Sequence, residues 1–113
     1  MKLLWFRTAI EDLRSVRRYV AQDNPAAARL LVDLIKVKAE LLLTFHDIGR
    51  PGRVPSTREL VIDGTPYILP YRVSGHEIQI LRVLHTSRQW PSGPLALTNF
   101  IGNQQHDSTP TNP

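Results

Sequence analysis

The chain of 113 residues is long enough for one domain with a single core, because two cores would each be marginal at half that length. Its hydrophobic fraction of 42% and charged fraction of 21% exclude an intrinsically disordered chain, and no uncharged run reaches the roughly 20 residues of a membrane helix. With no cysteine and a net charge of +4, disulfides and thiolate zinc sites are excluded and a basic surface is expected.

The first segment, "KLLWF" at residues 2–6, is too short for an amphipathic helix and predicts a buried strand. A signal peptide needs an apolar core of roughly 7–15 residues, and charged residues interrupt this region from Arg7 onward. We therefore expect a cytoplasmic protein.

Two consecutive helices are predicted next. Thr8 and Glu11 have the spacing of a capping box, and apolar residues then recur at helical spacing, which predicts a helix over residues 8–22. Asn24 can cap a second helix, and Pro25 suits its first position, where the missing N–H is harmless. The short link predicts an antiparallel hairpin. The apolar stripe expected on the second helix comprises Leu30, Leu31, Leu34, Ile35, Leu41, Leu42 and Phe45.

A three-stranded antiparallel meander is predicted after a loop at residues 47–57, which is rich in glycine and proline. Asp63 and Gly64 form the favoured two-residue hairpin signal between the first two strands. Pro66 and Pro70 cannot donate ladder hydrogen bonds, so each must lie at an edge, a bulge or a ladder end. The three runs are "RELVI", "YILPYRV" and "EIQILRVLH".

Residues 1–91 therefore form one domain, and residues 92–113, poor in charge and rich in Asn, Ser, Thr and Pro, are predicted to be a flexible tail. The order β-α-α-β-β-β predicts an α+β fold, with a helical hairpin packed on one face of a small, mainly antiparallel sheet. The other face of the sheet stays partly open, and we expect the functional site there.

No metal or cofactor site is expected, because the histidines (His46, His76, His85 and His106) stand too far apart for a helical or hairpin metal site. Arginine supplies eleven of the fourteen basic residues, and its planar fork grips carboxylates or phosphates with paired hydrogen bonds. The expected partners are an acidic protein or a nucleic acid; the simpler interpretation is a solvated basic surface.

Three stretches carry a resemblance to a known family: "GRPGRVPSTRELVI", "GTPYILPYRV" and "ILRVLHTSRQWP". Together with the helix start "NPAAA", they resemble the RelE/ParE superfamily over residues 3–91, the toxins of bacterial type II toxin–antitoxin modules. The resemblance implies a small cytoplasmic protein that arrests growth or stabilises a plasmid and that a cognate antitoxin neutralises. RelE-like members cleave messenger RNA on the ribosome, whereas ParE-like members poison DNA gyrase.

The positions that carry the RelE-like nuclease chemistry are mostly replaced here. RelE-like toxins use Lys or Glu on the first strand of the meander, Arg on the next, and Arg, His or Tyr near the end of the last. By the resemblance, the corresponding positions hold Glu59 and Val61, then Ile68, then His85 followed by Thr86. Only His85 and Glu59 are of a suitable type.

A nuclease site rebuilt from other residues is the alternative. Such chemistry needs a base, an acid and cations for the developing phosphorane charge. His85 is the candidate acid or base, because histidine is the side chain most often used for that role, and arginines can hold phosphate. Because alternate residues of a strand point to opposite faces, Arg82 and His85 share a site only if the strand ends or bulges between them. The candidates are His85, Arg82, Arg72 and Arg58, with Arg88 as a further phosphate contact.

Each candidate also has a structural interpretation. His85 is then a hydrogen-bonded residue at the end of a strand. Arg72 and Arg82 pair with carboxylates such as Glu59 or Glu77 in a structural network. Near the end of the domain, Trp90 would then serve the fold or recognition as a hydrophobic anchor, and Arg88 as a basic contact.

The expected protein partner is the antitoxin, which in this superfamily lies over the helical hairpin and the sheet. An acidic antitoxin would complement the arginines of the two predicted helices, with much of the affinity coming from buried apolar anchors. These arginines are Arg14, Arg17, Arg18 and Arg29.

The depleted nuclease set favours a toxin directed at DNA gyrase. The alternatives are a ribosome-dependent messenger-RNA endonuclease and a non-toxic relative that binds an antitoxin and acts in transcriptional autoregulation. If the chain is an enzyme, it is an endoribonuclease.

Overall fold

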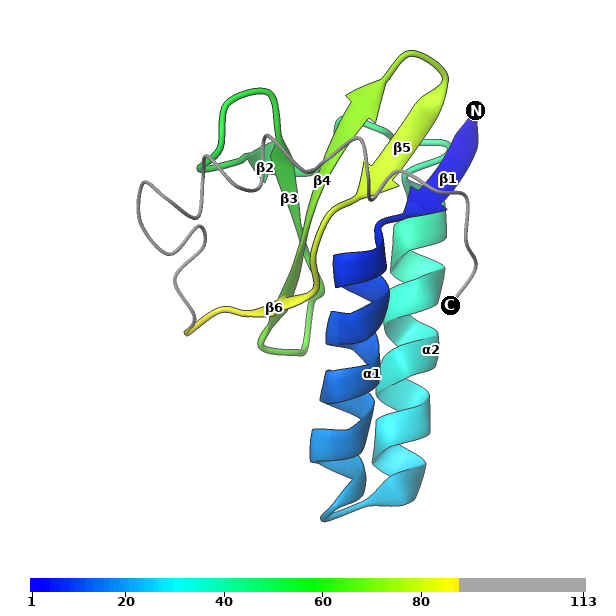
Figure 1. Ribbon diagram of the computed structural model, residues 1–113, viewed down its shortest axis with the longest axis vertical. Coiled ribbons are helices and arrows are strands. Elements are labelled where there is room, and N and C mark those ends of the chain that lie inside the picture. The colour runs from blue at the N-terminus through cyan, green and yellow to red at the C-terminus, as the bar shows by residue number, and fades with distance from the viewer. Residues whose placement is uncertain (88–113) are drawn as a thin grey trace.

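The computed structural model describes residues 1–87 and contains two helices and six strands within that range (Figure 1). The elements are β1 (Lys2–Trp5), α1 (Arg7–Ala21), α2 (Pro25–Leu41), β2 (Arg50–Pro51), β3 (Arg58–Val61), β4 (Tyr67–Ser74), β5 (Glu77–Ile80) and β6 (Leu84–His85). The predicted tail at 92–113, together with Arg88 and Trp90, lies outside the described residues.

The strands form one sheet in the order β1-β5-β4-β3-β2, with β6 pairing to β4 beyond the end of β5. β1 is parallel to β5, and every other pair is antiparallel. The helices form an antiparallel hairpin that packs on one face of this sheet (Figure 1). The predicted α+β fold is confirmed, and the structure adds the short β2 within the segment predicted as a loop.

The hairpin turn forms as predicted, because Asn24 caps α2 and Pro25 occupies its first position. The Asn24 side-chain oxygen accepts a hydrogen bond from the Ala27 N–H at 3.1 Å. Replacing Asn24 by alanine is expected to lower the free energy of unfolding by about 1 kcal/mol, since this N–H loses its acceptor. Urea denaturation measures the change. Asn24→Asp keeps an acceptor and should lose much less; equal losses would contradict the capping role.

The capping box predicted at Thr8 is wrong. α1 begins one residue earlier, at Arg7, after Phe6, which makes no side-chain cap. The Thr8 hydroxyl instead donates to the carbonyl oxygen of Leu81, 2.9 Å away. Thr8 therefore ties the first turn of α1 to the segment that follows β5.

The predicted apolar stripe of α2 is confirmed in part, because Ile35 and Leu42 are buried in the core and Leu31 and Leu34 pack against it. Leu30 is 70% exposed, and Phe45, which lies beyond the end of the helix, is 54% exposed. Apolar residues occur on nearly every side of α2, so periodicity alone does not select the buried side. Neither helix of residues 1–87 has the length and apolar run that would cross a membrane. The residues of this segment that do enter the core are Ala28, Val32, Ile35, Ala39 and Leu42.

The main core lies between the hairpin and the sheet. It joins Trp5 of β1, Leu13 of α1, Ile35 of α2 and Leu69 of β4, each exposed by 3% or less. Smaller apolar clusters lie on the opposite face, where strand alternation directs the intervening residues. One comprises Val54, Ile68 and Leu84, and the other Leu4, Phe6 and Leu81.

The last predicted strand is broken by a bulge. Tyr71 pairs with Ile80 of β5, whereas Ile68 pairs with Leu84 of β6. Two residues of β4 lie between these two pairs, but three residues, 81–83, lie between them on the opposing strand. One extra residue therefore separates β5 from β6, and it reverses the alternation of side chains beyond it.

Pro70 lies opposite this bulge, in agreement with the prediction for its missing N–H. Its carbonyl oxygen accepts a hydrogen bond from the Leu81 N–H at 2.9 Å, while its nitrogen has no proton to offer the ladder. Pro66 stands just before β4, where its carbonyl oxygen accepts from the Thr86 N–H at 2.7 Å. Both prolines thus avoid the regular ladder positions that need a donor.

Candidate functional site

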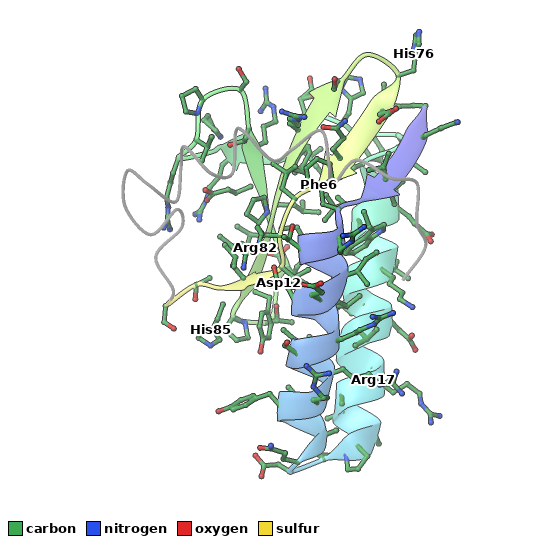
Figure 2. The ribbon with its side chains drawn as sticks, in the orientation of Figure 1. Phe6, Asp12, Arg17, His76, Arg82 and His85 are labelled. Carbon is green, nitrogen blue, oxygen red and sulfur yellow. The ribbon has the colours of Figure 1, made fainter. Side chains whose placement is uncertain are left out.

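The bulge places Arg82 and His85 on the same side of the sheet, facing α1 (Figure 2). Arg82 reaches Asp12 of α1, and His85 lines a cleft that Asp12 also lines. Arg82 and His85 were expected to share a site only if the strand ends or bulges between them, and the bulge is present. The cleft lies on the helix side of the sheet and not on the opposite face, where the sequence predicts the site.

Asp12 holds the bulge against α1 through three hydrogen bonds. Arg82 donates from Nε to Oδ2 at 2.7 Å and from a terminal nitrogen to Oδ1 at 3.1 Å. The backbone N–H of Val83 donates to Oδ2 at 3.0 Å. This paired geometry, with the side chains only 30% and 19% exposed, neutralises the Arg82 charge. Arg82 thus pairs with a carboxylate, as its structural interpretation expects, but the partner is Asp12 and not Glu59 or Glu77.

His85 is fixed by contacts to both of its sides. Its ring meets the Tyr67 ring edge-on, with centroids 5.5 Å apart. The backbone N–H of Ser87 lies 3.1 Å from Nδ1 and the Ser87 hydroxyl lies 2.7 Å from it. Because a backbone N–H can only donate, Nδ1 is an acceptor and the proton of the neutral ring sits on Nε2. His85 therefore presents Nε2–H as its available donor.

The cleft beside His85 has a volume of about 560 Å³, within the range of small-ligand sites. Among residues 1–87, its lining offers hydroxyl groups, one carboxylate and one histidine but no lysine or arginine. Arg18 approaches through a hydrogen bond to Ser15 at 3.3 Å. Within residues 1–87, no three His, Asp or Glu side chains are grouped closely enough to hold a metal ion. The lining residues are Asp12, Ser15, Val16, Tyr19, Tyr67, Val83, His85 and Ser87.

Sequence reasoning missed the α1 side of this cleft. Asp12 lies four residues before Val16 and seven before Tyr19, so helical spacing places all three on one side of α1. From that spacing, the sequence alone could have predicted that Asp12 lies at the border of the apolar stripe of α1. Nothing local in the sequence, however, pairs this edge with a strand 70 residues later.

Arg58, the first residue of β3, lies away from the cleft, and its side chain contacts the turn that follows α2. It donates to the carbonyl oxygens of Asp47 and Gly49 at 3.3 and 2.8 Å. Tyr71, opposite Arg58 in the β3–β4 register, donates its hydroxyl to the His46 carbonyl oxygen at 2.9 Å and accepts the Gly49 N–H at 2.9 Å. Burial raises the pKa of the Tyr71 hydroxyl, against the opposing effect of the Gly49 hydrogen bond. Arg58 and Tyr71 together clamp this turn.

Arg72 lies on the sheet face opposite the helices, so the four catalytic candidates do not form one site. Its Nε donates to the Gln79 side-chain oxygen, and the Gln79 amide nitrogen donates to Glu77 at 3.2 Å. Burial lowers the pKa of the Arg72 guanidinium. The predicted direct pairing of Arg72 with a glutamate is wrong, because Gln79 stands between Arg72 and Glu77.

Glu59, which the resemblance places at a nuclease position, is 2% exposed and serves the loop before β3. Arg50 donates two hydrogen bonds to one carboxylate oxygen at 3.1 and 3.3 Å. The other oxygen accepts the Arg53 backbone N–H at 3.2 Å and lies 3.9 Å from the Arg53 Nε. With both carboxylate oxygens accepting hydrogen bonds from the loop before β3, Glu59 is a structural group.

The helical hairpin exposes both charged and apolar side chains on surfaces turned away from the core. Along α2, Leu30, Val37 and Leu41 are 70, 56 and 40% exposed at helical spacing, with the partly buried Leu34 between them. No described carboxylate forms an ion pair with any of the exposed arginines predicted to meet an antitoxin: Arg14, Arg17, Arg18 and Arg29.

The sequence model of the ParE toxin of the type II toxin–antitoxin system parDE matches residues 3–90, most of the chain. The chain belongs to the ParE toxin family. The matched residues span the fold from the second residue of β1 through β6 and include both sides of the cleft.

Named relatives support the membership of this ParE-family chain. It is 40% identical over 90 residues to the putative toxin Y4kP of Sinorhizobium fredii, covering 80% of this chain and 93% of the relative. It is 31% identical over 87 residues to toxin RelE2 of Caulobacter vibrioides, covering 77% and 97%. It is 35% identical over 80 residues to toxin RelE3 of the same organism, covering 69% and 86%.

The fold of this ParE-family chain also matches a solved structure. A chain of the chromosomal ParDE toxin–antitoxin system from P. aeruginosa aligns with a TM-score of 0.68 and 36% sequence identity. The match covers 75% of this chain and 95% of that one. This chain therefore shares its helical hairpin and its mainly antiparallel sheet with a solved ParDE chain, as the resemblance implied.

Proposed function

We propose that this ParE-family toxin acts in the cytoplasm, arrests growth by poisoning DNA gyrase, and is neutralised by a cognate antitoxin. One observation carries the choice of target: the cleft at His85 has no lysine or arginine among its described lining residues. Asp12 already neutralises Arg82, and Arg58 and Arg72 lie elsewhere. RNA cleavage needs cations near the developing phosphorane, so this arrangement supports the gyrase-directed branch.

A messenger-RNA endonuclease is the second candidate, and three observations favour it. The cleft is large enough for a nucleotide, and His85 presents Nε2–H there as a potential acid. Two relatives also carry the name RelE. In this alternative, the transition-state charge would need cations supplied by the ribosome or the substrate complex.

The test is to induce the chain alone in bacteria and to follow DNA and RNA separately. The proposal expects DNA breaks and altered plasmid supercoiling before any change in messenger-RNA ends. His85→Ala, verified as folded by circular dichroism, is expected to keep its toxicity. Early cleavage within translated codons, abolished by His85→Ala with its roughly 10²- to 10⁴-fold acid–base contribution, would instead establish the nuclease. Normal growth at confirmed soluble expression would contradict both and leave autoregulation.

The exposed surface of the hairpin supports antitoxin binding. The hairpin exposes an apolar row on α2 and also arginines that have no ion pair among residues 1–87. Such a surface suits an amphipathic segment with apolar anchors and complementary charge. The apolar row consists of Leu30, Leu34, Val37 and Leu41, and the arginines are Arg14, Arg17, Arg18 and Arg29.

Changing Leu30 and Val37 together to serine is expected to weaken antitoxin binding at least about tenfold, mainly through faster dissociation. Both side chains are more than half exposed, so the fold should tolerate the change. Arg14→Glu with Arg18→Glu should mainly slow association and reduce its dependence on salt. Surface plasmon resonance separates the two rates; an unchanged dissociation rate for the serine variant would contradict this docking site.

A further inference from the structure

Arg72 is a half-buried cation with an open end. Its Nε is used by the Gln79 side-chain oxygen, but within residues 1–87 its two terminal nitrogens make no hydrogen bond and no ion pair. Gln79 is itself 5% exposed and is oriented by its hydrogen bond to Glu77. The guanidinium is therefore held in place from one side, with four N–H donors available on the other.

Other arginines of the sheet region are satisfied by the protein itself. Arg82 is paired with Asp12, and Arg50 is paired with Glu59. Arg58 donates to two carbonyl oxygens. Removing part of the water shell of Arg72 without supplying an anion costs free energy in the isolated chain. An anion that binds the open end recovers this cost, which is the arrangement of a recognition site.

The surroundings favour one carboxylate over a nucleic-acid backbone. Glu77 lies beside Gln79 on β5, and Glu59 lies opposite Pro70, two residues from Arg72 along β4. Alternation places these carboxylates on the same face as Arg72, where they would repel a chain of phosphates. Phe6, whose ring lies in the apolar cluster of this face, is 1% exposed and offers no surface for stacking a base.

We propose that the open end of Arg72, on the face of β4 and β5 opposite the helices, binds a carboxylate side chain of the antitoxin. This inference rests on the proposed function, because it assumes an antitoxin. It names a residue and a chemical group for the sheet contact that the resemblance implies, on the other side of the sheet from the helical hairpin. A bound antitoxin would therefore touch both layers of the fold.

The test is Arg72→Met, which keeps the length of the side chain and removes its charge. The probe is the antitoxin isolated as the protein that co-purifies with the wild-type chain. Arg72→Met is expected to weaken its binding about 30-fold, and Arg72→Lys to recover only part of this loss, because lysine lacks the fork. Lys2→Gln removes a charge from the neighbouring strand and should change binding less than about threefold.

Two further measurements separate recognition from a structural role. The melting temperature of free Arg72→Met should fall by no more than a few degrees, because removal of a desolvated charge offsets the loss of the hydrogen bond to Gln79; a mainly structural role predicts a larger fall. In double-mutant cycles over the Asp and Glu residues of the antitoxin, one carboxylate should couple to Arg72.

If Arg72→Met binds the antitoxin as tightly as the wild-type chain does, this inference is overturned and the proposed function stands. The same holds if Arg72→Met leaves antitoxin binding unchanged but weakens the binding of a DNA or RNA oligonucleotide. Failure of any protein to co-purify with the wild-type chain overturns both the inference and the antitoxin part of the proposed function.

Discussion

Replacing Asp12 by alanine is expected to lower the free energy of unfolding by about 3 kcal/mol. The change removes the acceptor of three hydrogen bonds and leaves Arg82, which is only 30% exposed, without its counter-charge. It also frees the Val83 N–H at the bulge. Urea or thermal unfolding of the purified chain measures the loss.

Asp12→Asn is the matched control, because it keeps the shape and one acceptor oxygen and should lose less. The double variant Asp12→Ala with Arg82→Met should recover part of the loss, since it removes the unpaired charge as well. A loss below about 1 kcal/mol for Asp12→Ala would contradict the view that this pair fastens the bulge to α1. It would also restore Arg82 as a cation free for chemistry.

Replacing Gly49 by alanine is expected to destabilise the fold by about 3 kcal/mol. An added Cβ would lie 2.5 Å from Cε1 of Tyr71 and 2.7 Å from its hydroxyl oxygen. Tyr71 is fully buried, so its ring cannot move aside without disturbing the core. The movement would also break the hydrogen bonds of the hydroxyl to Gly49 and His46.

Gly64→Ala is the control for the backbone alone. Gly64 has a φ of +80°, and an added Cβ there would meet nothing within 4 Å, so its cost should stay near 1 kcal/mol. Tyr71→Phe removes only the hydroxyl and should cost about 1–3 kcal/mol, because the Gly49 N–H loses its acceptor. A Gly49→Ala loss no larger than that of Gly64→Ala would contradict the steric argument.

The fold was predictable where the signal is local. Asn24 and Pro25 end one helix and start the next through their own chemistry, so the hairpin follows from adjacent residues. The register of the meander follows from its turns and alternation. Thr8 was misassigned because its hydroxyl binds Leu81, a partner that no capping pattern contains. The stripe of α2 was predicted only in part, because Leu30 and Leu41 are exposed and Val32 lies in the core in their place.

The site was less predictable than the fold, because it depends on contacts between distant residues. The missing N–H of Pro70 pointed to an irregular ladder, but not to which strand would carry the extra residue. The partner of Arg82 stands 70 residues earlier, on a helix face whose own pattern gives no hint of an arginine. Charge alone suggested Glu59 and Glu77, both of which are engaged by nearer groups.

The parallel pairing of β1 with β5 sets a limit on when the chain can fold during its synthesis. β1 leaves the ribosome first, yet its partner, residues 77–80, follows only after all other strands but β6. The ion pair of Asp12 likewise cannot form until Arg82 has been made. Such distant contacts close late and slowly, since the intervening chain must first be made and ordered. A chain built this way completes its sheet only after residues 77–85 have been made, so a fragment that ends before them carries no finished fold.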